Sequence, residues 1–584
     1  MNELENPLPQ RDSGKREFAV WAPQARSQVE VALRDQRIPL RQNGSWWHTT
    51  AAARPGDRYA FVLDGGPERP DPQSLAQPEG PHERSAVVDL EAHRWHDSDW
   101  PGRPLRGSAI YELHIGTFTP DGTFDAAIEK LDHLVALGIS LIEVMPIACF
   151  PGTRGWGYDG VTPYAVHEVY GGAAACQRFV DACHQRGIGV LLDVVYNHLG
   201  PSGNYLSQFG PYFTEHYATP WGPAVNLDGT GSDEVRRYFI DNAVMWLRDF
   251  HFDGLRLDAV HELHDGRAMH FLEELSRRID SLASQLGRPL TLIAESDRND
   301  PRTVAALDDS GSGLGLTGQW SDDIHHALHV LLTDETGGYY SDFADSGAIP
   351  KVLRTPFFHD GTWSSFRGRH HGRPVDLERT ASWRYVASLQ THDQIGNRAT
   401  GDRLSASLSP GRLASGAALL LTSQYTPMLF MGEEWGASTP WQYFTDHQEP
   451  ELAAAVSEGR RREFASHGWT ANVPDPQAFS TFANSKLAWS ERAEDDHQRL
   501  LDWYAALLRL RHDTPSLTSD GPPQVRRDGM TITVRRDDLV VLVNLGGFDA
   551  AIPGEIVLSF GDVRAHEALV TVGPDSVVIL KTQQ

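Results

Sequence analysis

Residues 252–263 read FDGLRLDAVHEL, and this stretch decides how the rest of the chain is interpreted. Its first half is an apolar strand whose side chains alternate between two faces, so Arg256 and Asp258 point the same way while the neighbouring leucines point the other way. His261 follows where such a strand would open into a loop. The pair is either an ordinary surface ion pair or part of a site, and the remaining sequence distinguishes the two.

Size and charge exclude several classes of protein. A chain of 584 residues is too long for one ordinary core. Its 52 basic and 78 acidic side chains give a net charge of −26, which opposes binding to nucleic acid or anionic membranes. No apolar run approaches the roughly 20 residues of a membrane helix, and the polar first residues do not resemble a secretory signal. We therefore expect a cytoplasmic protein without nucleic-acid or membrane partners. Its oligomeric state cannot be predicted.

The three cysteines predict neither disulfide bonds nor a zinc site. Cys149, Cys176 and Cys183 are too few and too irregularly spaced for a set of disulfides or a zinc site. We expect them to be small buried side chains in a reducing compartment.

From residue 108 onward, β-rich segments alternate with helix-length amphipathic segments. Eight strand candidates occur in this order: 108–118, 140–150, 188–198, 252–260, 290–296, 316–320, 384–393 and 426–434. Eight repeated βα units predict an α/β fold, specifically a (β/α)₈ TIM barrel.

Short strands separated by turn signals flank this pattern on both sides. They predict an N-terminal and a C-terminal β-sandwich. The segment FAVWAP resembles the opening of a sandwich that is similar to a carbohydrate-binding module. We expect three domains, at residues 1–100, 101–521 and 522–584. The long insertion 199–233 after the third barrel strand, and the segment 355–374, exceed ordinary βα loops and are expected to wall a site.

Polar side chains gather at the ends of four predicted barrel strands. The third strand ends in a segment that contains Asp193, Asn197 and His198, and the other three contribute Arg256, Asp258 and His261, then Glu295, then His392 and Asp393. The carboxyl ends of parallel barrel strands meet at one end of the barrel, where active sites are built. Any one of these residues alone is more often a helix cap or a structural side chain. Their coincidence at four strand ends indicates a site.

Three converging carboxyl groups suit glycoside hydrolysis. The poor leaving group must be protonated by one carboxyl while another, ionised carboxyl faces the anomeric carbon. Different surroundings can separate two carboxyl pKa values enough to assign these roles. Arg256 would keep Asp258 charged and oriented.

The motifs around these residues resemble the α-amylase superfamily of glycoside hydrolases, family 13. DVVYNH, GLRLDAVH, AESD and THDQIGN are similar to its four signature regions, in the same order. The resemblance implies that Asp258 is the nucleophile, Glu295 the general acid/base and Asp393 a third carboxylate that binds sugar hydroxyls. It also implies retention of anomeric configuration, for which the two key carboxyls stand about 5 Å apart. The positions expected to surround the sugar are Tyr158, His198, Arg256, His261 and His392.

Longer segments resemble one branch of that superfamily, the maltooligosyltrehalose trehalohydrolases. They lie at 318–343, 390–404 and 430–447. This resemblance implies a substrate, maltooligosyltrehalose and related α-glucan oligosaccharides, that is cut next to a terminal trehalose. Hydrogen-bonding groups in a shaped pocket can select such an end group. The residues we expect to form that pocket are Asp322, Asp323, His326 and Glu434, with Trp221 as a stacking face, although helix capping and loop packing explain them equally well.

Two other functions are weighed against this one. A branching or debranching α-glucan enzyme also joins an N-terminal sandwich to such a barrel, but the segments near the sixth and eighth strands argue against it. A non-catalytic glucan-binding protein would have lost one of the three carboxylates. Many amylases bind calcium at the position of Asn197, but further ligands cannot be matched here, so we expect no metal and no cofactor.

Overall fold

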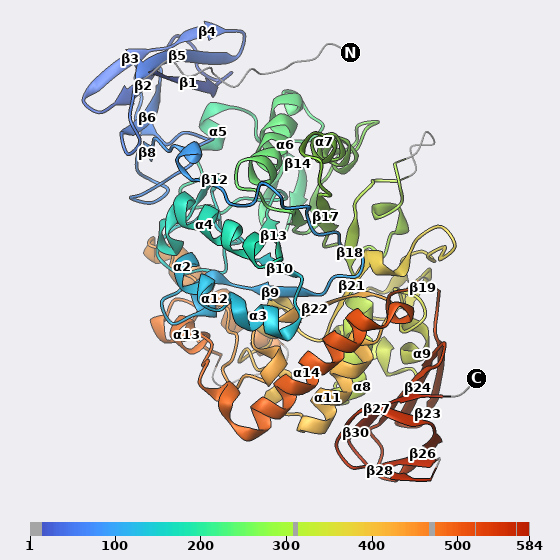
Figure 1. The fold of residues 1–584 in the computed structure, drawn as a ribbon. Coiled ribbons are helices and arrows are strands. Elements are labelled where there is room, and N and C mark those ends of the chain that lie inside the picture. Colours follow the sequence, from blue (N-terminus) through green and yellow to red (C-terminus); the bar gives the residue numbers. More distant parts are fainter. Residues whose placement is uncertain (1–14, 308–312, 467–472, 520, 568, 583–584) are drawn as a thin grey trace.

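A computed structural model of the chain describes residues 15–307, 313–466, 473–519, 521–567 and 569–582. Its centre is a closed barrel of eight parallel strands (Figure 1). The strands, in chain order, are β9 (Ile110–Leu113), β10 (Leu141–Val144), β13 (Gly189–Val194), β16 (Gly254–Leu257), β17 (Thr291–Ala294), β18 (Gly318–Trp320), β21 (Tyr385–Ser388) and β22 (Thr426–Phe430). Every strand pairs with its successor and β22 closes onto β9, which confirms the predicted (β/α)₈ barrel.

The helices around the barrel begin and end where local sequence requires it. They include α3 (Leu131–Leu137), α4 (Gly172–Gln185), α6 (Ser232–Arg248), α7 (Phe271–Leu286), α8 (Asp322–Thr333), α11 (Pro410–Leu421), α12 (Pro450–Ser466) and α14 (Asp495–Asp513). Gly138 and Gly287 end α3 and α7 in the left-handed conformation, at φ 98° and 67°, which an L-residue adopts at a cost. The ends of these helices are thus encoded locally.

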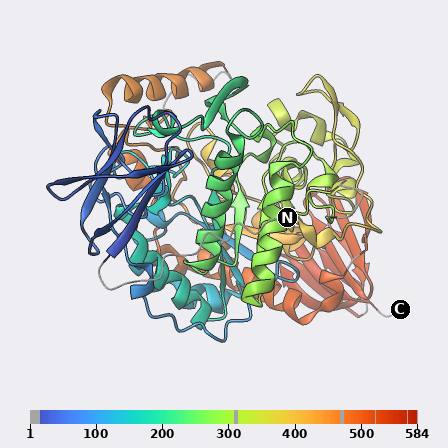
Figure 2. The same ribbon diagram turned by 90° about the horizontal axis from the view of Figure 1, so that it is seen from above.

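Two β-rich units flank the barrel, as the sequence predicted. The N-terminal unit has one sheet of β1 (Lys15–Trp21), β5 (Trp46–Ala52) and β4 (Arg41–Asn43), and another of β3 (Gln36–Pro39), β2 (Val29–Leu33), β6 (Arg58–Leu63), β7 (Glu68–Arg69) and β8 (Ser85–Ala86). The C-terminal unit has a sheet of β23 (Gln524–Asp528), β24 (Thr531–Arg536), β25 (Leu539–Asn544), β30 (Ser576–Lys581) and β27 (Glu555–Phe560), and a second of β26 (Ala550–Pro553), β29 (Leu569–Val572) and β28 (Val563–His566). Both views place these units on opposite sides of the barrel (Figures 1 and 2).

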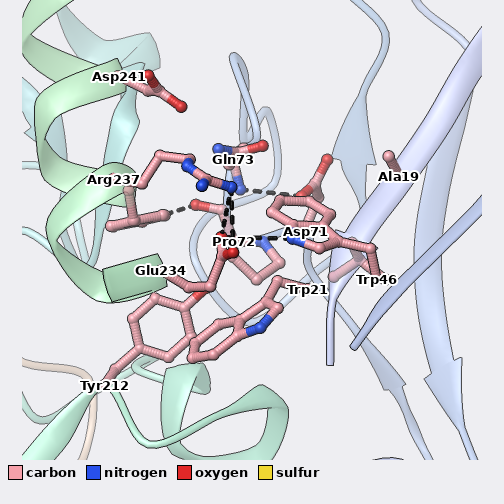
Figure 3. Close-up of a pocket in the computed structure, with 12 residues that line it drawn as sticks. Ala19, Trp21, Trp46, Asp71, Pro72, Gln73, Tyr212, Glu234, Arg237 and Asp241 are labelled. Atoms are coloured by element: carbon pink, nitrogen blue, oxygen red, sulfur yellow. Dashed lines mark hydrogen bonds and ion pairs between the residues drawn. The ribbon is translucent and has the colours of Figure 1, made fainter. Parts of the chain in front are cut away.

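The N-terminal unit is fixed to the barrel through aromatic side chains. Figure 3 shows Trp21 and Trp46 facing Tyr212 and the first turns of α6. The indole of Trp46 donates to Glu234 over 3.3 Å, and the rings of Trp21 and Tyr212 pack edge to face at 5.2 Å. The space enclosed between them, of about 20 Å³, is enough for roughly one water molecule and too small for a sugar. This contact joins the two units rather than binding a ligand.

The insertion after β13 has structure of its own. It carries the short helix α5 (Leu206–Phe209) and a hairpin of β14 (Phe213–Thr219) and β15 (Gly222–Val225). A second small hairpin, β19 (Thr362–Ser364) with β20 (Arg369–His371), stands in the segment before β21. In the part of the chain that the structure describes, no helix is both long and apolar enough to cross a membrane.

Candidate active site

The side chains predicted to act together meet at the carboxyl ends of the barrel strands. Asp258 directly follows β16 and Glu295 directly follows β17. His392 and Asp393 begin the short helix α10 (His392–Gly396), which follows β21 after three residues. Parallel pairing of β16 with β17 brings the first two carboxyl groups together from neighbouring strands.

Arg256 is the centre of the charge network. Its side chain is fully buried, and Nη1 donates to Asp193 over 2.7 and 2.9 Å and to Asp258 Oδ1 over 2.9 Å. Nη2 lies 3.5 Å from Glu295 Oε2. Burial lowers the pKa of Arg256, but these acidic neighbours raise it well above its usual value. The expectation that Arg256 and Asp258 share one face is confirmed, and their pairing is not a surface ion pair.

Asp258 is held at both carboxylate oxygens. Oδ1 accepts from Arg256, and Oδ2 accepts from Asn197 Nδ2 over 2.9 Å. Its backbone N–H donates to the Val194 carbonyl over 3.1 Å. Charge-assisted bonds of this kind fix the orientation of a carboxylate. Asn197, at the position where many amylases hold calcium, directs its amide toward Asp258 here.

Glu295 is held in its protonated form. Burial, which outweighs the opposing charge of Arg256, raises the pKa of Glu295 to about 8. Asp258, Asp393 and Asp322 raise it further, because a second negative charge nearby is unfavourable. Oε2 accepts a hydrogen bond of 2.5 Å from the backbone N–H of Ala259. Glu295 and Asp258 therefore differ in the way that a general acid and a nucleophile require.

The residues of α10 are positioned from both ends of that helix. Thr391 caps it by accepting from the Gln394 N–H over 3.2 Å. At the other end a Cβ on Gly396 would lie 2.0 Å from the ring of Trp156, so only glycine lets the helix pack there. Trp441 donates to the His392 carbonyl over 3.0 Å. Asp393, which is half-exposed, is thus held in place by a helix that is fixed at both ends.

His392 joins a network that the sequence did not reveal. Glu112, on β9, accepts from the His392 backbone N–H over 3.0 Å and bonds its Nδ1. Burial lowers the pKa of His392, but the carboxylates of Asp393 and Glu112 raise it to about 9. The hydroxyl of Tyr158 lies 2.7 Å from His392 Nε2 and donates to Asp193 Oδ2 over 2.6 Å. A continuous chain of bonds therefore runs from Glu112 to Arg256.

A second acidic side chain stands beside Glu112. Glu143 of β10 is its register partner, and among the described residues neither oxygen of the Glu143 carboxyl has a hydrogen-bond partner. Burial and the charge of Glu112 raise the pKa of Glu143 well above its usual value, which keeps it neutral. A lone acidic residue within each apolar segment, 108–118 and 140–150, was the only sequence signal for these two.

His198 and Trp221 lie against each other beside Tyr158. Their rings stack at 4.3 Å and 10°, and Trp221 is 50% exposed on the turn of the β14–β15 hairpin. His198 Nε2 lies 3.1 Å from the Tyr158 carbonyl, and burial lowers the pKa of His198. Tyr158, His198 and Trp221 thus lie together, and the half-buried His261 lies one turn after Asp258.

The residues expected to recognise the end group fall into two sets. Burial raises the pKa of Asp322 to about 7, with contributions from Asp323 and Asp393, and Asp322 in turn raises the pKa of Glu295, so Asp322 lies near the other carboxyl groups of the site. Asp323 is buried beneath it and accepts from Asn299 and from the backbone N–H groups of Phe358 and His359, which fastens the 355–374 segment. His326 packs among the rings of Tyr339, Tyr340 and Phe343.

Glu434 does not lie with the others. Its side chain is fully buried, accepts from the hydroxyl of Tyr111 over 3.1 Å and bonds His133 of α3 at 2.8 Å. Tyr111 precedes Glu112 on β9, so its side chain points to the opposite face of the strand, toward the surrounding helices. The structure therefore removes Glu434 from the expected pocket, because it faces away from the barrel interior.

Known proteins with similar sequences and structures are glycoside hydrolases of the α-amylase type. The α-amylase catalytic domain family matches residues 91–218. The malto-oligosyltrehalose trehalohydrolase of Arthrobacter ramosus is 53% identical over 97% of this chain and 99% of its own, and that of Rhizobium sp. (strain M-11) is 52% identical over 97% and 98%. A crystal structure of a Salmonella typhimurium protein described as an α-amylase superposes with a TM-score of 0.90, at 36% identity over 98% of this chain and 99% of that one.

A barrel with these carboxyl groups at one end and a β-rich unit on either side defines a glycoside hydrolase of the α-amylase class. The sequence identity of more than 50% to two trehalohydrolases, over nearly the whole chain, identifies the family within this class. The chain belongs to the family of malto-oligosyltrehalose trehalohydrolases.

Proposed function

We propose that this chain is a retaining hydrolase that cleaves the α-1,4-glucosidic bond next to the terminal trehalose of maltooligosyltrehalose, releasing trehalose and a maltooligosaccharide. The observation that carries the proposal is the contrast between two neighbouring carboxyl groups. Glu295 is held protonated by burial, whereas Asp258 is ion-paired with Arg256. The names of the relatives supply the substrate.

The proposed roles follow from these contacts. Asp258 attacks the anomeric carbon while Glu295 gives its proton to the departing glycosidic oxygen, and a glycosyl ester on Asp258 results. Glu295 then takes a proton from water, which attacks the same carbon and releases Asp258. Asp393 and the charged imidazole of His392 bind sugar hydroxyls, and Tyr158 contributes a ring face, as Trp221 does on the other wall.

The preference for a trehalose end is assigned to the side of the cleft around Asp322. Among the residues that the structure describes, the Asp322 carboxyl has no hydrogen-bond partner, and it lies close enough to Glu295 to raise the pKa of that group. A hydroxyl of the bent trehalose end would hydrogen-bond to the Asp322 carboxyl. An ordinary maltooligosaccharide end, which has a different shape, would leave this carboxyl unpaired. Asp323 and His326 would hold the segments around Asp322 in place, through the hydrogen bonds of Asp323 and the ring contacts of His326.

Two further assignments complete the proposal. The domains are taken as residues 1–100, 101–521 and 522–584, and the partners as maltooligosyltrehalose and related α-glucan oligosaccharides. The cytoplasm is the proposed compartment, since Cys149, Cys176 and Cys183 are all buried and free, as is usual where disulfides are rare.

The experiment compares two oligosaccharides of equal length, one an ordinary maltooligosaccharide and the other ending in trehalose. Chromatography identifies the products, and NMR taken before mutarotation identifies the anomer released. Rapid release of trehalose from the second substrate alone, with an α-configured new reducing end, is expected. Equal cleavage of both substrates, or action only on branched glucan, would reject the trehalohydrolase. The second of these outcomes would favour a branching or debranching enzyme.

A further inference from the structure

Helix α12, which follows β22 in the chain, reaches back to α10 through one arginine. Most of α12 is exposed or half-buried, but the Arg460 side chain is only 10% exposed. Its Nη2 donates to the carbonyl of Gly396, the last residue of α10, although the two residues lie 64 positions apart in the chain. Because α10 begins with His392 and Asp393, Arg460 bonds the far end of the helix that carries two residues of the proposed site.

The bond from Arg460 caps α10 at its carboxyl end. The last carbonyl groups of a helix have no N–H partner within the helix, so they need partners from outside it. A positively charged side chain is a favourable partner for them, because the hydrogen bond is then charge-assisted. Arg460 supplies this partner to the Gly396 carbonyl.

The guanidinium of Arg460 is itself held in one orientation. It lies over the ring of Tyr443 at 5.3 Å and over the ring of Phe464 at 4.5 Å. Tyr443 packs edge to face against Trp156 at 5.2 Å, and the Trp156 ring is the one that leaves room only for a glycine at position 396. The packing of these rings therefore aims the arginine at the end of α10.

The peptide group that Arg460 holds leads directly to Asp393. Asn397 follows Gly396, and its side chain donates from Nδ2 to Asp393 Oδ1 over 3.4 Å. The backbone N–H of Asn397 donates to the Asp393 carbonyl over 2.9 Å. Since a peptide group is planar, a bond that fixes the Gly396 carbonyl also fixes the direction of the Asn397 N–H. A side-chain bond as long as 3.4 Å is lost after a small shift of either residue.

We propose that Arg460 is a positioning residue for the third carboxylate: through the Gly396–Asn397 peptide group it sets where the carboxylate of Asp393 stands. The inference rests on the proposed function, in which Asp393 binds sugar hydroxyls. Hydrogen bonds to sugar hydroxyls strengthen in the transition state of glycoside hydrolysis. A displaced carboxylate should therefore lower kcat more than it raises KM.

Three variants of α12 test this role. Arg460→Met keeps the length of the side chain without its donors, and we expect kcat to fall by about 10- to 100-fold while KM changes by less than about threefold. Arg460→Lys returns one donor and should recover most of the lost kcat. Arg462→Met is the matched control, because Arg462 is 74% exposed on the same helix and pairs with Glu458; its kcat should equal that of wild type. Wild-type kcat in Arg460→Met would overturn the proposal.

A double-mutant cycle separates positioning from a general loss of structure. In the Asp393→Ala background, Arg460→Met should change the residual kcat by less than about twofold, because the group through which Arg460 acts is already absent. The full loss of kcat on top of Asp393→Ala would overturn the proposal. Asn397→Ala removes the link at an exposed position and does not depend on the folding of the Arg460 variants. It should lower kcat as Arg460→Met does, and wild-type kcat in Asn397→Ala would also overturn the proposal.

The outcome is independent of the proposed substrate. If wild type cleaves only ordinary or branched glucans, the trehalohydrolase is refuted, and the same variants are compared on the glucan that is cleaved. If wild type cleaves no glucan, the proposed function fails, and crystal structures of wild type and Arg460→Met decide. The Asn397 side chain is expected to have left Asp393 Oδ1 in Arg460→Met. An unchanged contact between Asn397 and Asp393 would overturn the positioning role.

Discussion

The backbone N–H of Ala259 donates to Glu295 Oε2 over 2.5 Å, and Ala259 does so from the left-handed region, at φ 38° and ψ 52°. A residue with a Cβ seldom stands there, and the strain is typical of functional sites. The turn after Asp258 is thus bent to bring an N–H donor to the neighbouring strand. This N–H is therefore expected to fix the position of the Glu295 carboxyl, the proposed general acid.

A β-branched side chain at this position should disturb both stability and activity. Ala259→Val is expected to lower the free energy of unfolding by roughly 1–3 kcal/mol, because the left-handed conformation becomes costlier. It should also lower kcat, since Glu295 loses its donor when the turn relaxes. Ala259→Gly, which adopts this conformation freely, is the control for stability. Denaturant unfolding and initial rates measure the two effects, and equal stability of the valine and glycine variants would contradict the strain.

Asp258→Asn should remove turnover while keeping the fold. The amide retains the size of the side chain but cannot form the glycosyl ester, so we expect kcat to fall by about 10⁴-fold or more. Asp132→Asn removes a carboxylate that is 84% exposed on α3 and should change nothing. Residual activity near that of wild type in Asp258→Asn would assign the nucleophile elsewhere.

We expect the raised pKa of Glu295 to set the alkaline limit of activity. The acid form donates the proton, so kcat/KM should stay constant below about pH 8 and fall above it.

The Glu295 carboxyl should also make the free energy of unfolding depend on pH. Its usual pKa is 4.5, so its contribution to folding is fully present below pH 4.5 and is lost as the pH rises through about 8. Glu295→Gln should abolish activity and remove this part of the pH dependence of unfolding. An alkaline limit that stays at pH 8 in residual Glu295→Gln activity would implicate another group.

Asp322 and Glu434 should respond differently to truncation, although both stand in the segments that resemble trehalohydrolases. Asp322→Ala is expected to lower the kcat/KM preference for trehalose-ended substrate by about 10- to 100-fold, the loss of one charged hydrogen bond. Glu434→Ala is expected to keep that preference but to lower the free energy of unfolding by roughly 3 kcal/mol, because it leaves His133 and Tyr111 buried without their partner. Unchanged preference in Asp322→Ala would remove it from the pocket.

Chelation should leave the enzyme active. Asn197 donates its amide N–H to Asp258 and accepts at Oδ1 from His198 Nδ1, so both ends of its side chain are already bonded within the site. Activity and melting temperature after treatment with EDTA are expected to equal those before it. Loss of activity that calcium restores would contradict this.

The sequence was informative where chemistry and strand order coincide. The eight barrel strands could be located from their apolar runs, and Asp258 and Glu295 could be located because each directly follows its strand. The same reasoning could not separate Asp322 from Glu434, since both follow a strand and only tertiary packing decides which one faces the cleft. Glu112 was missed because a single acidic residue within an apolar strand has no local pattern. The β14–β15 hairpin also escaped prediction, because glycine and proline in the insertion suggested loops.

The bonded chain from Glu112 through His392, Tyr158 and Asp193 to Arg256 draws on distant parts of the sequence, from β9 to α10. Each member satisfies a buried group of the next, so a change at one leaves its neighbour unsatisfied. Substitutions here should therefore be strongly epistatic: a replacement tolerated in one lineage would fail when moved alone into another. These bonded residues can therefore change in evolution only together, whereas residues in surface loops can be replaced one at a time.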